Sequence, residues 1–371
     1  MAAQTNDGSQ TPDEFHNSQA RLDTHVPVVK AERAEAGLDG LVGDLQCLIV
    51  NTEPGRFEQA VAEWLRFSGM DLAEAFEGGG LKTAVLKTDG SADLLVRCRT
   101  DGPNPFAGMA EFPKCRHLPN TRLEAYVFET PDLAKYESIQ RGRGVAFLTG
   151  APLRTANLSF LQTPASTLTG NSIGLIQWHG ARGQYAGDGD EPLSLNLEKP
   201  DGGFQRNIRY VDHLATRLRA ADRDAAILEF MSLTNYDFDQ AFFVESMNSI
   251  TNVARMKGAT FAMVFTTGIR PYVTDAESGP TEKFVHNYGP RTHHIAMHTE
   301  HIEDTFAALV AEGMGFLVEL VGSPEEGLRQ TFTEPSPHTL LVNEYIHRYG
   351  DFDGFFTRSN VTALTAATEK Q

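Results

Sequence analysis

The sequence lacks the features of membrane-spanning, secreted and nucleic-acid-binding proteins. No run of 18 or more apolar residues occurs, and the first 40 residues contain no apolar core of a signal peptide. The only cysteines, Cys47, Cys98 and Cys115, do not have the CxxC spacing of a zinc ribbon, so we expect free, buried thiols. The 32 basic and 49 acidic residues give a net charge of −17, which argues against nucleic acid or an anionic membrane as a partner. We therefore expect a cytoplasmic protein.

Length and local composition predict two domains. The chain has 371 residues, of which 41% are hydrophobic, enough to build two cores. Residues 1–40 are polar and show little periodicity, so we expect a mostly disordered tail or arm. Glycine, aspartate and proline cluster in residues 183–204, which we interpret as a linker between domains at 41–182 and 205–371.

The two halves repeat the same local pattern. LQCLIVNT, a predicted strand, precedes the amphipathic RFEQAVAEWLRFSGM in the first half, and YVDHLATRL precedes DRDAAILEFMSLT in the second. LEAYVFETPDLAKYESIQ likewise parallels HIAMHTEHIEDTFAALVAEGMG. The pattern predicts an α+β fold of four strand-helix-strands modules in two pairs.

Three residues of the second half are candidate metal ligands: His213, His294 and Glu344. They lie 81 and 50 residues apart, and each falls in a predicted strand, with the two histidines at the same place in their modules. Two imidazoles and one carboxylate on one face of a metal leave coordination positions open, as in non-heme Fe(II) oxygenases. The matching positions in the first half are Cys47, Ala125 and Gly174, which form no credible set of donors.

Strand alternation also predicts which neighbours point away from this site. Side chains on either side of a given strand residue project to the opposite face of the sheet. We therefore expect Asp212 and Leu214 to point away from His213, and His293 and Ile295 to point away from His294.

The second half resembles a known family. VDH at the start of a module, HHIAMHTEHIEDTFAALVAEGMGFL, the Q-x-F-T of residues 330–333 and NEYIHRYGDFDGFF are similar to 4-hydroxyphenylpyruvate dioxygenases and hydroxymandelate synthases. These enzymes belong to the vicinal oxygen chelate superfamily. The resemblance covers residues 205–365 and implies two tandem vicinal oxygen chelate domains that form open mixed barrels, the first without a metal site.

The resemblance also implies a reaction. In that family two histidines and a glutamate bind Fe(II), which by position are His213, His294 and Glu344. The 2-oxo acid group of the substrate chelates the iron, O2 is the co-substrate, CO2 leaves, and the rest of the molecule is hydroxylated. A dry, apolar cavity is needed around such a centre, and Phe332 is a suitable wall.

The substrate pocket departs from the family pattern. Ser249, Gln330 and Phe355 match residues that face the substrate in the family. Four other positions do not match: Val264, His293, Val342 and Val361. Because a buried hydroxyl without a polar partner is costly, we expect a 2-oxo acid other than 4-hydroxyphenylpyruvate as the small-molecule substrate.

Three alternatives stay open from the sequence. An extradiol dioxygenase would use the same ligands with an acid-base residue, for which His298 or Tyr345 could serve. A glyoxalase-like enzyme would use a non-redox metal on a related frame. The superfamily also includes ligand-binding proteins without activity, and the vacant first half could serve as an interface in a homo-oligomer.

Overall fold

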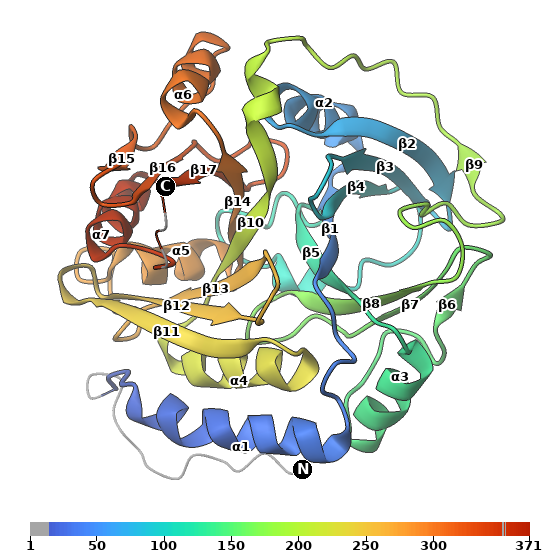
Figure 1. The fold of residues 1–371 in the computed structure, drawn as a ribbon, viewed down its shortest axis with the longest axis horizontal. Helices are drawn as coiled ribbons and strands as arrows, with labels where there is room; N and C mark the ends of the chain where they lie inside the picture. The colour runs from blue at the N-terminus through green and yellow to red at the C-terminus, as the bar shows by residue number, and fades with distance from the viewer. Residues whose placement is uncertain (1–14, 351, 353) are drawn as a thin grey trace.

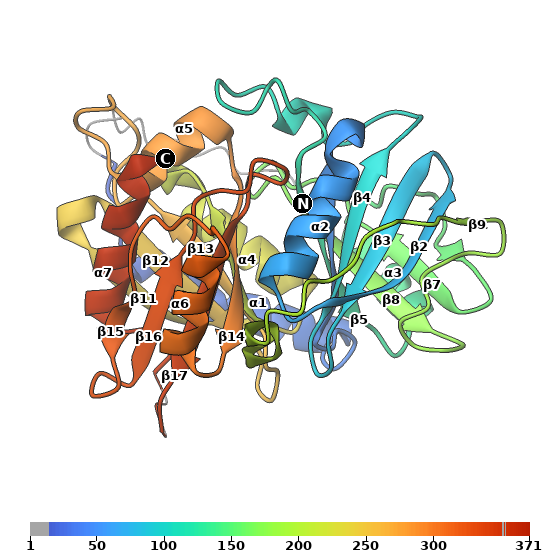
Figure 2. The ribbon, with the colours of Figure 1, turned by 90° about the horizontal axis from the view of Figure 1, so that it is seen from above.

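The structure consists of two curled β-sheets side by side, each with helices along its outer face (Figures 1 and 2). It is a computed structural model, and it describes residues 15–350, 352 and 354–371. The first sheet contains, in spatial order, β6 (Leu153–Arg154), β7 (Leu158–Gln162), β8 (Ser172–Trp178), β5 (Arg122–Glu129), β1 (Leu45–Thr52), β4 (Asp93–Arg99), β3 (Leu81–Lys87), β2 (Asp71–Gly78) and β9 (Glu191–Pro192). The second contains β15 (Val321–Ser323), β16 (Leu328–Phe332), β17 (Val342–Arg348), β14 (Arg291–Thr299), β10 (Ile208–Arg217), β13 (Ala262–Thr267), β12 (Ser249–Arg255) and β11 (Asp237–Val244).

The two sheets have the same strand order apart from β9, which pairs with the edge strand β2. Strands β1 and β4 are parallel, as are β5 and β8, and the same holds for β10 with β13 and β14 with β17. The central pairs, β1 with β5 and β10 with β14, are antiparallel. This repeated mixed topology confirms the predicted α+β fold of two tandem domains, each an open, curled mixed sheet.

The helices follow the predicted modules. They are α2 (Phe57–Phe67), α3 (Leu133–Gly142), α4 (Arg223–Leu233), α5 (Pro280–Tyr288), α6 (Ile302–Ala311) and α7 (Arg358–Ala367), in addition to α1 (Ala20–Ala36). Helix α2 buries Phe57, Val61, Trp64 and Leu65 at helical spacing, which explains why it forms and where it packs. Helices α5 and α7 have no counterpart in the first half of the chain. No described helix is long and apolar enough to cross a membrane.

The expectation of a mostly disordered tail over residues 1–40 is wrong for Ala20–Ala36, which form α1, while residues 1–14 lie outside the described part of the chain. Helix α1 lies along α4 of the second half (Figure 1). Of its residues only Leu22 and Arg33 are buried, so it has no apolar stripe that periodicity could reveal. The Arg33 guanidinium instead donates to the carbonyls of Met231, Thr234 and Tyr236 and pairs with Asp237.

The two halves also meet at their central strands. The Tyr126 hydroxyl of β5 lies 2.5 Å from the Thr216 hydroxyl of β10 and 2.7 Å from the Thr292 hydroxyl of β14. All three groups are buried, and burial raises the pKa of Tyr126 above its usual range. The barrel of the second half is therefore held against the first by buried hydrogen bonds, on the strands that carry the candidate ligands.

Candidate metal centre

The three predicted ligands converge in the structure. His213 lies on β10, His294 on β14 and Glu344 on β17, three neighbouring strands of the second sheet. Ala296 pairs with both His213 and Glu344, which places the latter two in one row across the sheet. Glu344 Oε2 is 3.1 Å from His213 Nε2 and 3.2 Å from His294 Nε2, and one donor atom from each residue lies within 4.8 Å of the others.

The empty first half has the same frame. Val127 pairs with Cys47 on one side and with Gly174 on the other, just as Ala296 pairs with His213 and with Glu344 in the second half. The structure therefore places Cys47, Ala125 and Gly174 at the positions equivalent to the three candidate ligands. Side chains without metal-binding donors at Ala125 and Gly174 leave this half without a site.

The charges of the second half suit a divalent cation. Burial favours the neutral forms, but the Glu344 and Asp212 carboxylates together raise the pKa of His213 to about 9. The pKa of Glu344 is lowered to about 2, because the two histidines outweigh the cost of burying its charge. A bound metal would take the place of the proton between these groups.

Orphaned polar atoms show that the residues fit a metal. His213 Nε2 is buried and, although it lies 3.1 Å from Glu344 Oε2, forms no hydrogen bond of acceptable geometry, and Glu344 Oε1 is buried without a partner. Such groups are costly unless a ligand satisfies them. Two imidazoles and a carboxylate are donors that Fe(II), Mn(II) and Zn(II) accept, and three protein ligands leave room for substrate. The site can thus hold a divalent transition metal through His213, His294 and Glu344.

The expectation that Asp212 and His293 point away from the site is wrong, because both sit at irregularities in the strand pairing. Between Val211 and His213, β10 advances two residues while β14 advances one, so Asp212 is the extra residue of a bulge. His293 is the extra residue of a second bulge on β14. Bulges interrupt the alternation of side chains, and each extra residue here contacts the ligand beside it.

Asp212 orients His213. Its Oδ1 lies 2.8 Å from His213 Nδ1, and its two oxygens also receive the Arg348 guanidinium. Despite its burial, Arg348 and His213 hold the pKa of Asp212 well below its usual range, so Asp212 is a carboxylate that accepts from His213 Nδ1–H. Nε2 is then left as the metal-binding nitrogen.

His293 orients His294 in the same way. His293 Nε2 lies 2.8 Å from Gln371 Oε1, an oxygen that can only accept, so this nitrogen carries the proton. His293 Nδ1, 2.8 Å from His294 Nδ1, then accepts a hydrogen bond from His294 Nδ1–H and leaves His294 Nε2 free for the metal. Burial lowers the pKa of His293 well below its usual value, so the ring is neutral.

A cavity of about 40 Å³ adjoins His294 and Glu344. Its further lining comes from β10, β12, β13, β16, α7 and the segment before α7: Arg217, Thr251, Val264, Thr266, Gln330, Phe332, Phe356, Val361, Leu364 and Thr365. The predicted Val264, Gln330 and Phe332 are therefore at the cavity, and Gln330 Oε1 is buried there without a partner. Sequence reasoning missed Arg217, although it lies on β10 at even spacing from His213.

Other predicted residues lie off this cavity. Ser249 does not line it, and its hydroxyl lies 3.3 Å from that of Thr281. The ring centroid of Phe355 lies 5.3 Å from that of His213, so Phe355 packs against this candidate ligand. His298 stacks on Tyr210, and the Tyr345 hydroxyl donates to the carbonyl of Phe67. Neither His298 nor Tyr345 lines the cavity, which argues against an extradiol acid-base role for them.

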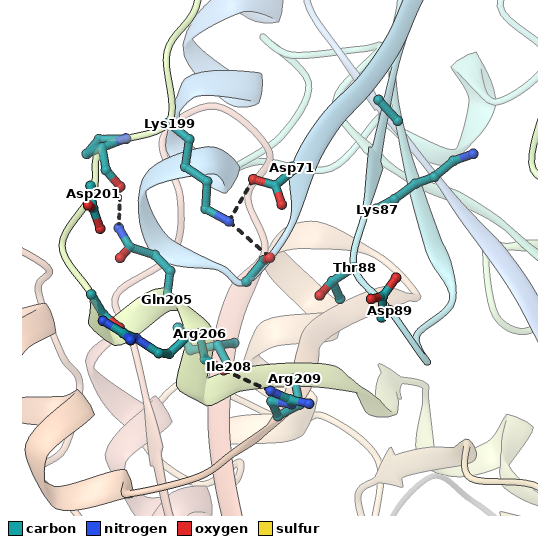
Figure 3. A pocket seen from close by; sticks show the side chains of 14 residues that line it. Asp71, Lys87, Thr88, Asp89, Lys199, Asp201, Gln205, Arg206, Ile208 and Arg209 are labelled. Atoms are coloured by element: carbon teal, nitrogen blue, oxygen red, sulfur yellow. Dashed lines mark hydrogen bonds and ion pairs between the residues drawn. The ribbon is translucent and has the colours of Figure 1, made fainter.

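A larger cavity of about 760 Å³ lies elsewhere, between β2, β3 and the segment that leads into β10 (Figure 3). It contains none of the three candidate ligands. Among its charged residues, Lys199 pairs with Asp71, and Lys199 Nζ lies 3.0 Å from both Asp71 Oδ1 and the Gly69 carbonyl. Volume therefore does not identify the site, whereas the orphaned donors beside the small cavity do.

Comparison with known proteins gives likeness in structure only. The sequence matches no protein-family profile and no curated protein. The structure is similar to a substituted 4-hydroxymandelate synthase from Streptomyces coelicolor, with a TM-score of 0.65, 16% identity, and coverage of 89% of this chain and 99% of that one. It is also similar to a fusion of a xylose isomerase-like TIM barrel with 4-hydroxyphenylpyruvate dioxygenase, with a TM-score of 0.62, 14% identity, and coverage of 94% and 58%.

A third similar structure is an Mn(II)-bound glyoxalase from Novosphingobium aromaticivorans. It has a TM-score of 0.50 and 11% identity, and covers 85% of this chain and 86% of its own. At these identities the likeness shows the fold alone. The chain thus has the same tandem fold as these three proteins.

Proposed function

We propose that the protein is a non-heme Fe(II) dioxygenase that oxidatively decarboxylates and hydroxylates a 2-oxo acid other than 4-hydroxyphenylpyruvate. The observation that carries the proposal is the buried cluster of His213, His294 and Glu344, in which His213 Nε2 and Glu344 Oε1 have no hydrogen-bond partner, beside a small cavity. Bound Fe(II) would supply a centre that accepts a chelating substrate and O2 together.

The chain's own residues provide the rest of the site. Asp212 and His293 fix the ring orientations of the two histidines, so that both present Nε2 to one point. Phe332, Val264 and Leu364 exclude water from the reacting group, which protects reactive species from side reactions. Gln330 offers its unpaired Oε1, and the amide of the same side chain, to orient a polar group of the substrate.

The lining of the cavity supports a substrate other than 4-hydroxyphenylpyruvate. Val264 lines it where the family resemblance implies a polar group, and Val361 where it implies an aromatic one, so a phenol would lose both of these contacts. Loss of a polar partner for a buried hydroxyl costs about 1–3 kcal/mol.

The test is an anaerobic titration of the Fe(II)-loaded protein with a series of 2-oxo acids. Chelation by the keto and carboxylate oxygens is expected to give a weak visible absorption band, and admission of O2 to give CO2 in equal amount to the O2 consumed. His213→Ala should lose stoichiometric Fe(II) binding, whereas the exposed His117→Ala should keep it.

Other outcomes separate the alternatives. Turnover of catechols but not of 2-oxo acids would favour an extradiol enzyme, and turnover without O2 in the Mn(II) form would favour a glyoxalase-like enzyme. Robust turnover of 4-hydroxyphenylpyruvate would refute the statement about substrate, and tight binding of an acid without turnover under any condition would indicate a ligand-binding protein.

A further inference from the structure

Arg217 is a buried charge without a counter-ion at the candidate site. Its side chain lines the same cavity as His294 and Glu344, and the residue is only 4% exposed. Nη2 donates to the Thr368 hydroxyl over 2.8 Å, and the guanidinium lies over the ring of Phe284 at 4.8 Å. Nη1 is buried and has no hydrogen-bond partner, and Arg217 forms no ion pair with a carboxylate in the described part of the chain.

Two other buried arginines of the second half have carboxylate partners. Arg348 is paired with Asp212, and Arg223 is paired with Asp224. Arg291, which pairs with Arg217 across β14 and β10, has no carboxylate partner among the residues that the structure describes, but it donates to the Thr121 carbonyl and does not line the cavity. Arg217 differs from all three because it lines the cavity and has an Nη1 without a partner. A buried cation is costly unless a group of opposite charge compensates it.

Hydroxyl groups surround the same part of the cavity. Thr251, Thr266 and Thr365 line it together with Arg217, from β12, β13 and α7 respectively. Hydroxyl donors beside a guanidinium suit an anion, whereas Phe332, Val264 and Leu364 suit the carbon chain of a ligand. The cavity thus combines two of the candidate metal ligands, an apolar wall and a group of donors suited to an anion.

The net charge of the site indicates how many carboxylates its ligand carries. A divalent metal and Arg217 would carry three positive charges against the single negative charge of Glu344, since imidazoles that bind a metal are neutral, His293 has one donor and one acceptor nitrogen, and Asp212 is balanced by Arg348. A 2-oxo acid that chelates the metal brings one negative charge and places it at the metal. A second carboxylate on the same molecule would make the filled site neutral.

We infer that Arg217 binds a second carboxylate of the substrate, so that the substrates are 2-oxo acids with a further carboxylate at the end remote from the keto group. This rests on the proposed function, because it assumes that the first carboxylate is at the metal. Arg217 follows His213 by four residues on β10, about 13 Å between Cα atoms, and the even spacing puts both on the same face of the strand.

The experiment compares matched pairs of ligands by calorimetry on the anaerobic Fe(II) protein, so that the readout is binding and not turnover. The pairs are 2-oxobutanoate with 2-oxobutanedioate, and the corresponding acids of five, six and seven carbons. For at least one length, the dicarboxylate should bind about ten- to hundredfold more tightly than its monocarboxylate, the range expected for charge-assisted hydrogen bonds.

Variants locate the effect. Arg217→Met should reduce the preference to threefold or less by weakening the dicarboxylate alone, and Arg217→Lys should keep part of it. The matched control is Arg219→Met, two residues further on, whose side chain is 50% exposed and pairs with Asp222. Fe(II) stoichiometry should be unchanged in all three. If Arg217→Met does not fold, the ligand pairs measured on the wild-type protein and on Arg217→Lys still test the inference.

Equal binding of both members of every pair by the wild-type protein would overturn the inference and leave the proposed function standing. An undiminished preference in Arg217→Met would overturn it as well. If no 2-oxo acid of any length binds to the Fe(II) protein, the inference and the proposed function fail together.

Discussion

Asp212 offers the sharpest test of how the second half of the chain prepares its metal centre. Asp212→Asn keeps the size of the side chain but removes the charge that accepts from His213 Nδ1–H and balances Arg348. An amide can also present its NH2 group to Nδ1, which would favour the wrong tautomer of His213. Loss of such an orienting carboxylate weakens metal binding by about 10- to 100-fold.

The same substitution should destabilise the metal-free protein. Asp212 is 3% exposed, and its removal leaves Arg348 with a largely buried and unbalanced charge. Breaking a buried pair in this way costs about 3–5 kcal/mol in the free energy of unfolding. Urea denaturation of the metal-free form measures this cost, and anaerobic competition with a chromophoric chelator measures the Fe(II) affinity of the folded protein.

The repeat supplies a control for Asp212. Gln46 is the bulge residue at the equivalent point of β1, and it contacts Trp178, Arg182 and Tyr185 in the half without ligands. Gln46→Ala should lower stability and leave Fe(II) affinity unchanged. Should Asp212→Asn bind Fe(II) within twofold of the wild type, Asp212 does not set the tautomer of His213 and the reasoning is refuted.

Three further predictions concern the fold. Burial raises the pKa of Glu282 to about 7 despite three backbone donors, so between pH 4.5 and 7 the folded chain keeps a proton that the unfolded chain loses. The free energy of unfolding should therefore fall by up to about 3 kcal/mol over this range, and Glu282→Gln should remove that pH dependence in urea titrations. Arg33→Met should release α1 from the second half, with faster proteolysis and hydrogen exchange at Ala20–Ala36 and a free energy of unfolding lower by about 2 kcal/mol. Unchanged protection from exchange would show that other contacts hold the helix. Gly174→Ala should cost about 1–3 kcal/mol, because the added Cβ would lie 2.9 Å from Val127 Cγ2 and 3.0 Å from the Phe160 ring, and wild-type stability in this variant would contradict that packing.

The repeat made the fold and the convergence of the three candidate ligands predictable. His213 and His294 occupy equivalent strands, and strands that are equivalent in a repeat lie next to each other when each module closes in the same way. A period of two along β10 also points to Arg217, since His213, Ala215 and Arg217 share one face. That signal was present in the sequence, but without the cavity it does not distinguish a site residue from a core arginine.

Asp212, His293 and α1 could not be predicted for physical reasons. A bulge adds one residue to a strand without any glycine or proline to mark it, so alternation assigns Asp212 and His293 to the wrong face. Helix α1 is held by an arginine that reaches backbone carbonyls, and these carbonyls become available only after α4 and β11 have folded. Hydrophobic periodicity contains no information on either contact.

The docking of α1 has a consequence for the order of events during synthesis. Helix α1 is made before any strand of either sheet, yet the groups that Arg33 binds lie at Met231–Asp237. Roughly two hundred residues must leave the ribosome before that surface exists, which at about 5–20 residues per second takes some 10–40 seconds. The first barrel can close in that interval, while α1 has no surface to pack against. Cleavage within residues 37–44 during this time would remove α1 and leave both sheets on one chain, the second of them without this helix.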